Sequence, residues 1–142
     1  MKIRKIKLNE LDRLVDIWYE ASIDAHEFIE QAYWKSQRKA MRETYLPMAD
    51  TYVISVGKQI TGFISMVEND VAALFVKADC QGKGYGKKLL QFVKENRNRI
   101  QLKVYQKNEQ AIRFYLKNGF EIREEQLDEL TGEKEYLMEW TT

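Results

Sequence analysis

The hydrophobic positions of this chain repeat with two different periods, so both helices and strands are expected. Leu11, Leu14, Val15 and Trp18 stand at i, i+3, i+4 and i+7, which is the spacing of one buried face of a helix. Elsewhere, period-two alternation and short apolar runs predict strands. Read in order, the pattern predicts a strand near 3–6, helices near 10–25 and 30–45, a hairpin at 52–56 and 60–67, a strand at 71–76, a helix that ends near 96–98, a strand at 100–105, a helix from 108 to 118, and strands near 120–124 and 135–140.

This order, β-α-α-β-β-β-α-β-α-β-β, indicates a mixed α/β domain with a largely antiparallel start and one strand–helix–strand crossover in the middle. The run VAALFV at 71–76 has little polar relief and is typical of a central strand covered on both faces. The second helix is expected to end before Pro47, because the residue before a proline disfavours helical geometry. With 142 residues and no linker, the chain is expected to form one domain, residues 1–142.

Composition narrows the possible functions. The chain has 23 basic and 22 acidic side chains, whereas dedicated nucleic-acid binders show a basic excess. One cysteine and one histidine leave neither a disulfide nor a zinc cluster. Counting leaves a carboxylate magnesium or calcium site open, but no EF-hand spacing appears, and we expect no metal. No apolar run approaches the ~20 residues of a membrane span, and the N-terminus lacks the apolar segment of a secretion signal. We therefore expect a cytoplasmic protein that binds neither nucleic acid nor membrane.

Three of the seven glycines, Gly82, Gly84 and Gly86, lie within five residues between the apolar strand and the next helix. Glycine permits positive φ and close approach of a ligand, and free amides at a helix N-terminus suit a phosphate. The run GKGYGKK (82–88) also carries three lysines. It is either a phosphate cradle or a tight turn with solvated lysines, and its position after a buried strand favours the cradle. It lacks the Ser/Thr of a Walker loop, and no acid follows where a dinucleotide-binding fold requires one.

Two motifs resemble those of the GNAT superfamily of acyl-coenzyme A-dependent N-acetyltransferases. The segment LFVKADCQGKGYG (74–86) is similar to the coenzyme A signature, a strand followed by Q/R-x-x-G-x-G/A. The segment NEQAIRFYLKNGF (108–120) is similar to the second signature, N-x-x-A-x-x-x-Y-x-x-x-G-F. The resemblance covers nearly the whole chain. It implies a GNAT-like fold, acetyl-CoA as the acetyl donor and a primary amine as the acceptor.

Two shorter segments, 26–29 and 102–108, resemble a bacterial branch of the superfamily and favour a protein lysine as the acceptor. One departure is visible, because Lys103 stands where relatives often carry an acid. This departure puts in doubt any mechanism that uses a carboxylate at that position.

The resemblance also implies which residues bind the cofactor. The strand before the glycines holds pantetheine through its main chain, and the turn holds the pyrophosphate. The amide of Val76 faces the thioester oxygen, where it can stabilise the charge of a tetrahedral intermediate. The expected cofactor-binding residues are Leu74, Phe75, Val76, Gln81, Gly82, Lys83, Gly84, Tyr85, Gly86, Lys87, Asn108 and Tyr115.

The chemistry requires two proton transfers. The leaving thiolate must be protonated, and a phenol with a pKa of ~10 can donate the proton. Tyr115 matches the tyrosine of the second signature and is the expected general acid; the alternative is a core aromatic residue.

The attacking amine must be neutral, and the possible bases are Asp70 acting through water, or His26, with its unperturbed pKa of ~6.5. Glu27 is a third possibility, and so is a water chain with no single base.

The acceptor site is expected between the first two helices, where the family lines its acceptor cleft. Glu27, Phe28 and Tyr105 are the expected substrate-binding residues, although the aromatic ones could instead be core contacts. The acceptor could be a protein lysine, a protein N-terminus or a small amine. A non-catalytic acyl-CoA-binding regulator on the same fold is the alternative of a different class, and the presence of Tyr115 favours the enzyme. The sequence leaves the choice between monomer and homodimer open.

Overall fold

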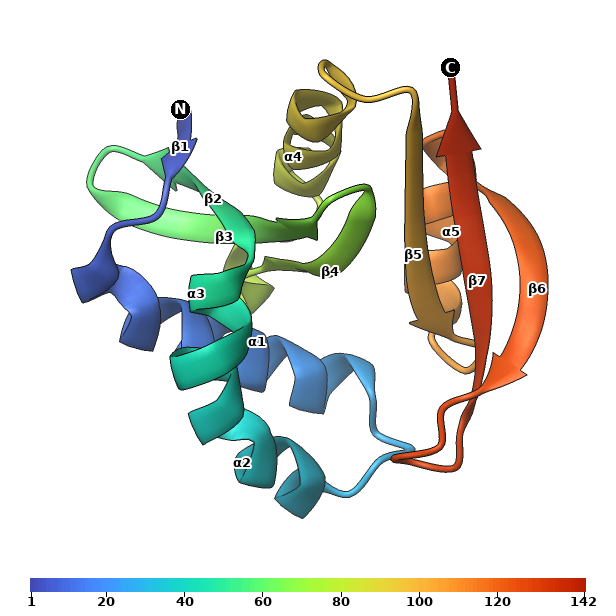
Figure 1. Cartoon of the computed structure of the whole chain (residues 1–142). Helices are drawn as coiled ribbons and strands as arrows, with labels where there is room; N and C mark the ends of the chain where they lie inside the picture. The colour runs from blue at the N-terminus through green and yellow to red at the C-terminus, as the bar shows by residue number, and fades with distance from the viewer.

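A seven-stranded sheet in the order β1-β2-β3-β4-β5-β7-β6 forms the centre of the computed structural model, which describes residues 1–142 (Figure 1). The sheet consists of two sets of strands: the first set is β1, β2, β3 and β4, and the second set is β5, β7 and β6. Within each set, every strand is antiparallel to its neighbour. The predicted order of elements and the mixed α/β fold class are confirmed. The strands are β1 (Lys2–Lys5), β2 (Asp50–Val56), β3 (Gln59–Val67), β4 (Asp70–Val76), β5 (Arg99–Tyr105), β6 (Glu121–Leu127) and β7 (Lys134–Thr141).

The two sets of strands meet at one end only. β4 and β5 run parallel, and their one register pair is Asp70 with Gln101. A bulge at Ala72 bends β4, since Ser65 pairs with Ala73 while Met66 pairs with Val71. Beyond the shared end the two strands diverge, as Figure 1 shows. Most of β4 therefore has no neighbouring strand on its β5 side. For this reason only Ala73 of β4 is buried. The strand is central as predicted, but the prediction that it is covered on both faces holds only in part, because Leu74, Phe75 and Val76 are half-buried.

Helices cover both faces of the sheet. On one face, α1 (Leu11–Ala25) and α2 (Gln31–Ala40) pack against β2, β3 and β4 around Trp18, Trp34 and Phe63. On the other face, α4 (Tyr85–Lys94) and α5 (Glu109–Lys117) share a second cluster with β5 and β7. Short 3-10 turns, η1 (Leu8–Glu10) and η3 (Ala78–Cys80), precede α1 and follow β4. Burial of these apolar side chains is the main source of stability.

The helical run after α2 passes through Pro47, so the prediction that it ends before this proline is wrong. A π-helical turn, η2 (Met41–Tyr45), is followed directly by α3 (Leu46–Met48). Pro47 lies at the start of α3, where a residue needs no amide hydrogen to continue the helix. The side chain of Leu46 is buried in the α1–α2 cluster and anchors this turn.

Candidate active site

The turn after β4 presents backbone amides that have no partner. Gly82 and Gly84 have φ angles of +79° and +87°, a region that side-chain-bearing residues rarely adopt. None of the amide N–H groups from Gln81 to Lys87 donates a hydrogen bond within the protein; the first to do so is that of Lys88, to the carbonyl of Gly84 at 3.1 Å. These groups lie at the N-terminus of α4, where the helix dipole adds partial positive charge. The turn can therefore bind an anion.

The space next to this turn is open. A Cβ built on Gly82 or Gly84 would meet no atom within 4 Å, so a ligand can reach the backbone there. Gly86 serves a different purpose, because its Cβ would lie 3.2 Å from the Cζ atom of Phe114 in α5. The third glycine thus lets α4 pack closely on α5. The lysines of the turn are exposed and supply positive charge around the free amides.

The open edge of β4 leads toward this turn. The amide of Lys77 donates to the carbonyl of Thr61 on β3 at 2.8 Å. Because successive residues of a strand turn to opposite edges, the amide of Val76 faces the open β5 side, and so does that of Leu74. The side-chain amide of Gln81 donates to the carbonyl of Val76 at 3.1 Å. This bond fixes the turn on the end of the strand.

Tyr115 lies in the second half of α5, within the cluster that α4 and α5 share. Its ring packs against Phe114 at 5.3 Å and Phe120 at 5.6 Å between centroids. Burial raises the pKa of its hydroxyl, and no hydrogen-bond partner contributes to the shift. The phenol therefore keeps its proton at neutral pH and has no partner inside the protein to donate it to.

His26 joins the end of α1 to the start of α5. Asn108 caps α5, and its Oδ1 accepts the amide of Ala111 at 3.2 Å. Its Nδ2 lies 3.3 Å from His26 Nε2, so Nε2 must accept, and the ring proton is on Nδ1. The residue is 8% exposed, and burial lowers its pKa to about 4. His26 is therefore neutral at pH 7, and neither ring nitrogen offers a free lone pair to a substrate.

Aromatic rings surround His26 and form what we call the acceptor wall, consisting of His26, Phe28, Trp34 and Tyr105. The ring of His26 lies 5.2 Å from Trp34, 5.7 Å from Phe28 and 5.2 Å from Tyr105 between centroids. The hydroxyl of Tyr105 donates to Asp128 Oδ2 at 2.5 Å. Burial and this carboxylate together raise the pKa of Tyr105. Figure 1 shows the turn between β6 and β7, which holds Asp128, beside the segment that joins α1 and α2.

Comparison with known proteins identifies the family. The GNAT acetyltransferase domain matches residues 47–122. The chain is 33% identical to the peptidyl-lysine N-acetyltransferase YiaC of Escherichia coli K12, over 97% of this chain and 95% of the relative. The chain belongs to the GNAT acetyltransferase family. The peptidyl-lysine N-acetyltransferase YjaB of Salmonella typhimurium LT2 is 30% identical over 86% of this chain and 84% of its own. The predicted resemblance to a bacterial branch of the superfamily is thus confirmed.

Solved structures agree with this assignment. The solution structure of apo YjaB from Escherichia coli has a TM-score of 0.87 and 27% identity, covering 98% of this chain and 96% of that one. The PaiA N-acetyltransferase of Thermoplasma acidophilum, solved in complex with coenzyme A, has a TM-score of 0.84. At 22% identity, over 99% of this chain and 98% of that one, it shows the shared fold.

Three other expected site residues of this GNAT acetyltransferase, Asp70, Glu27 and Asn108, lie outside the acceptor wall itself, and only Asp70 is far from it in the chain. Asp70 is exposed and lies opposite Gln101 of β5, at the end where β4 and β5 are still paired. Glu27 is exposed and makes no hydrogen bond or ion pair in the structure. Sequence reasoning missed Asp128, because nothing in its local pattern links it to Tyr105. It also assigned Asn108 to the cofactor, whereas both ends of its side-chain amide are already bonded within the protein.

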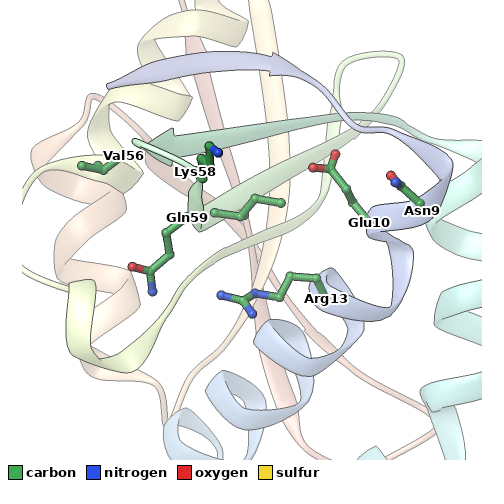
Figure 2. Close-up of a pocket in the computed structure, with 7 residues that line it drawn as sticks. Asn9, Glu10, Arg13, Val56, Lys58 and Gln59 are labelled. Atoms are coloured by element: carbon green, nitrogen blue, oxygen red, sulfur yellow. The ribbon is translucent and has the colours of Figure 1, made fainter.

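Two hollows lie outside the turn after β4. One, of about 510 Å³, lies between the start of α1 and the β2–β3 turn, and Figure 2 shows Glu10 and Arg13 opposite Lys58 and Gln59 there. It shares no residue with the expected site. The second, of about 400 Å³, adjoins the acceptor wall and is lined by Gln106, Lys107, Gly132, Glu133 and Lys134.

The structure holds no group of three or more potential metal-ligating side chains, and no helix long and apolar enough to cross a membrane.

Proposed function

We propose that this GNAT acetyltransferase moves the acetyl group of acetyl-CoA to the ε-amine of a protein lysine, by direct attack in a ternary complex. The observation that carries the proposal is the row of unpartnered amides from Gln81 to Lys87. The acceptor class is supported by the relatives YiaC and YjaB, both peptidyl-lysine N-acetyltransferases. The presence of Tyr115 favours an enzyme over a non-catalytic acyl-CoA-binding regulator.

The cofactor half of the site would be formed mainly by backbone. The free amides of the turn hold the diphosphate, and exposed Lys83 and Lys87 add attraction at longer range. Pantetheine lies along the open edge of β4, at Leu74, Phe75 and Val76. A β-strand edge is suited to this task, because its unpaired N–H and C=O groups are directed outward and fixed by the sheet. Tyr85 and Gly86 begin the helix on which the diphosphate rests.

The reaction would then proceed in two bond changes. The neutral amine attacks the thioester carbonyl, a C–N bond forms, and the amide of Val76 stabilises the oxyanion. The C–S bond breaks as the oxyanion collapses, and the phenol of Tyr115 gives its proton to the sulfur of coenzyme A. Solvent returns that proton to Tyr115 after the thiol has left.

The proton of the amine would leave through water to Asp70. Asp70 is exposed and therefore open to water, whereas His26 Nε2 accepts from Asn108 and Nδ1 carries the ring proton and is buried without a partner, so His26 has no lone pair to offer as a base. We assign His26, with Phe28 and Tyr105, to the wall along which the lysine side chain lies, and Glu27 to its solvent-exposed rim. This chemistry needs no metal. A cytoplasmic location and a single domain over residues 1–142 stay predictions.

Three classes of acceptor test the proposal. Thiol release from acetyl-CoA is measured with lysine peptides whose α-amine is blocked, with free-amine peptides in which arginine replaces lysine, and with small amines. We expect turnover with the first class, and mass spectrometry should place the acetyl group on the lysine. The matched control is the same peptide with its lysine already acetylated. Coenzyme A binding without turnover on any amine would favour the non-catalytic alternative and contradict the proposal.

A further inference from the structure

One face of the second set of strands carries no helix. In Figure 1, α5 lies behind β5, β7 and β6, and no helix lies in front of them. The α5-side cluster takes alternate residues of β5, which are Ile100, Leu102 and Val104. The intervening side chains therefore face the other way, together with their register partners on β7 and β6. The residues of this open face are Arg99, Gln101, Lys103, Tyr105, Glu135, Leu137, Glu139, Thr141, Glu121, Glu124 and Gln126.

The charge of the chain is divided unevenly, and the acidic part includes the β6 and β7 strands of this face. Residues 121–142 hold eight acidic and two basic side chains, for a net charge of −6. Residues 1–120 hold 14 acidic and 21 basic ones, for a net charge of +7. The near-neutral composition of the whole chain hides this separation.

The two ends of the open face differ in how their carboxylates are paired. At one end, Glu139 bonds to Arg99 and Arg123, and Glu121 lies 2.9 Å from Arg123. At the Tyr105 end, Glu135 and the neighbouring Asp128 form no ion pair, and neither does Glu124, which lies one register step away, opposite Leu137 of β7. We call these three residues the unpaired carboxylates. Arg99 of this face is taken up by Glu139, so its remaining positive charge is Lys103, which lies between the two ends and is exposed.

Glu135 is the most informative of the unpaired carboxylates, because it is 8% exposed. Its side chain makes one hydrogen bond, from the neutral amide of Gln126 to Oε2 at 2.6 Å. A carboxylate that is taken out of water without a cationic partner destabilises the free protein. Such a residue is well suited to a cation that arrives with the substrate.

The position of Glu135 relates it to the acceptor. Its register partner on β5 is Tyr105, whose ring contacts His26 and Phe28 in the acceptor wall. The hydroxyl of Tyr105 bonds to Asp128. Glu135 therefore stands one strand, about 5 Å, beyond the wall along which the reacting lysine lies. A neighbouring side chain of the same peptide can reach it.

We propose that the unpaired carboxylates bind a basic side chain of the acceptor protein beside the reacting lysine, and that Glu135 is the specificity-determining residue. This inference rests on the proposed function. Charge complementarity selects lysine or arginine at this place over neutral or acidic residues. The partner is thus a protein segment with at least two basic residues, one that reacts and one that binds the open face.

The test compares pairs of α-blocked lysine peptides that differ only in having arginine or glutamine at one position, scanned over four residues on each side of the lysine. For the wild type we expect kcat/KM to be about tenfold higher with arginine at one or more positions, an effect of about 1.4 kcal/mol. Glu135→Gln should abolish this preference and leave kcat/KM for the glutamine peptide unchanged. The matched control, Glu121→Gln, removes a carboxylate that is already paired and should retain the preference.

A second variant and the salt dependence guard against a folding defect. Glu124 is exposed on β6, so Glu124→Gln should leave thermal unfolding unchanged and reduce the preference in part. Raising ionic strength should also reduce the preference in the wild type. Acetylation of every peptide with no preference at any position would overturn this inference alone. Failure to acetylate any peptide lysine while small amines react would overturn the proposed function.

Discussion

The turn after β4 and the acceptor wall differ in what their polar groups already bind. In the turn, the amides from Gln81 to Lys87 are all free. In the wall, Asn108 is bonded to His26, and Tyr105 to Asp128. The turn is therefore ready to bind an anion without rearrangement, whereas the wall is already held together by its own contacts. The difference implies that changes in the turn will affect cofactor affinity, and that changes near the wall and Tyr115 will affect turnover.

The largest effect is expected from Tyr115→Phe. Because the hydroxyl has no partner in the protein, its removal should leave the fold and the affinity for acetyl-CoA unchanged. Loss of a general acid should lower kcat by about 10²–10⁴-fold. Steady-state kinetics and calorimetry measure the two quantities separately. Intact turnover with unchanged binding would show that another group protonates the thiolate.

The second effect is a change in the free energy of unfolding with pH. It reports on the acceptor wall, because His26 is the only histidine of the chain. Burial lowers the pKa of His26 to about 4, so the folded protein resists a proton that the unfolded chain accepts from about pH 6.5 downward. The contribution of neutral His26 to the free energy of unfolding is fully present above pH 6.5 and is lost as the pH falls toward 4. Linkage gives a loss of about 3 kcal/mol over this window.

Denaturant unfolding between pH 7 and 4.5 measures this loss. The control is His26→Gln, which has no titrating ring and should give a nearly flat profile over the same range. The hydrogen bond from Arg4 lowers the pKa of Glu10 to about 2, so that carboxylate affects stability only at lower pH. An equal slope in the wild type and in His26→Gln would contradict the buried, neutral state of the histidine.

The third effect belongs to the turn. Gly84→Val should weaken coenzyme A binding by at least about tenfold, because the side chain fills the approach to the amides and the positive φ adds about 1–2 kcal/mol of strain. Gly57→Val is the matched control, since Gly57 also has positive φ and open space, but lies in the β2–β3 turn. Calorimetry should find normal affinity for that control. Equal affinity in both variants would refute the role of the turn.

The smallest effect is the response to salt. Coenzyme A affinity should fall a few-fold between low and high ionic strength, because exposed lysines contribute part of the attraction. The fixed amides should retain most of the binding. If coenzyme A affinity does not change with ionic strength, Lys83 and Lys87 are merely solvated and do not attract the cofactor.

How far the sequence could predict each region depends on how local its contacts are. The turn is contained in seven consecutive residues, and the positive φ expected for Gly82 and Gly84 is confirmed. The different role of Gly86 depends on Phe114, which only the packing of two helices brings near. In the wall, Phe28 and Tyr105 were both predicted to bind the acceptor, and their ring centroids lie 5.7 Å apart, but the bond from Asn108 to His26 spans 82 residues and could not be read from local pattern.

The same reasoning explains the remaining differences. Pro47 was expected to end a helix because its local effect is unfavourable there, but the π-helical turn places it at the start of a new one. The unpaired state of Glu135 depends on strand register, which places it beside the neutral Gln126 and Tyr105. Alternation alone does not reveal which carboxylates will find a cation.

The most direct test of the account is a crystal structure of the protein with acetyl-CoA. We predict diphosphate oxygens at about 3 Å from amides between Gln81 and Lys87, the thioester oxygen facing the amide of Val76, and the sulfur within reach of the Tyr115 hydroxyl. Acetyl-CoA bound elsewhere, with these amides still free, would contradict it.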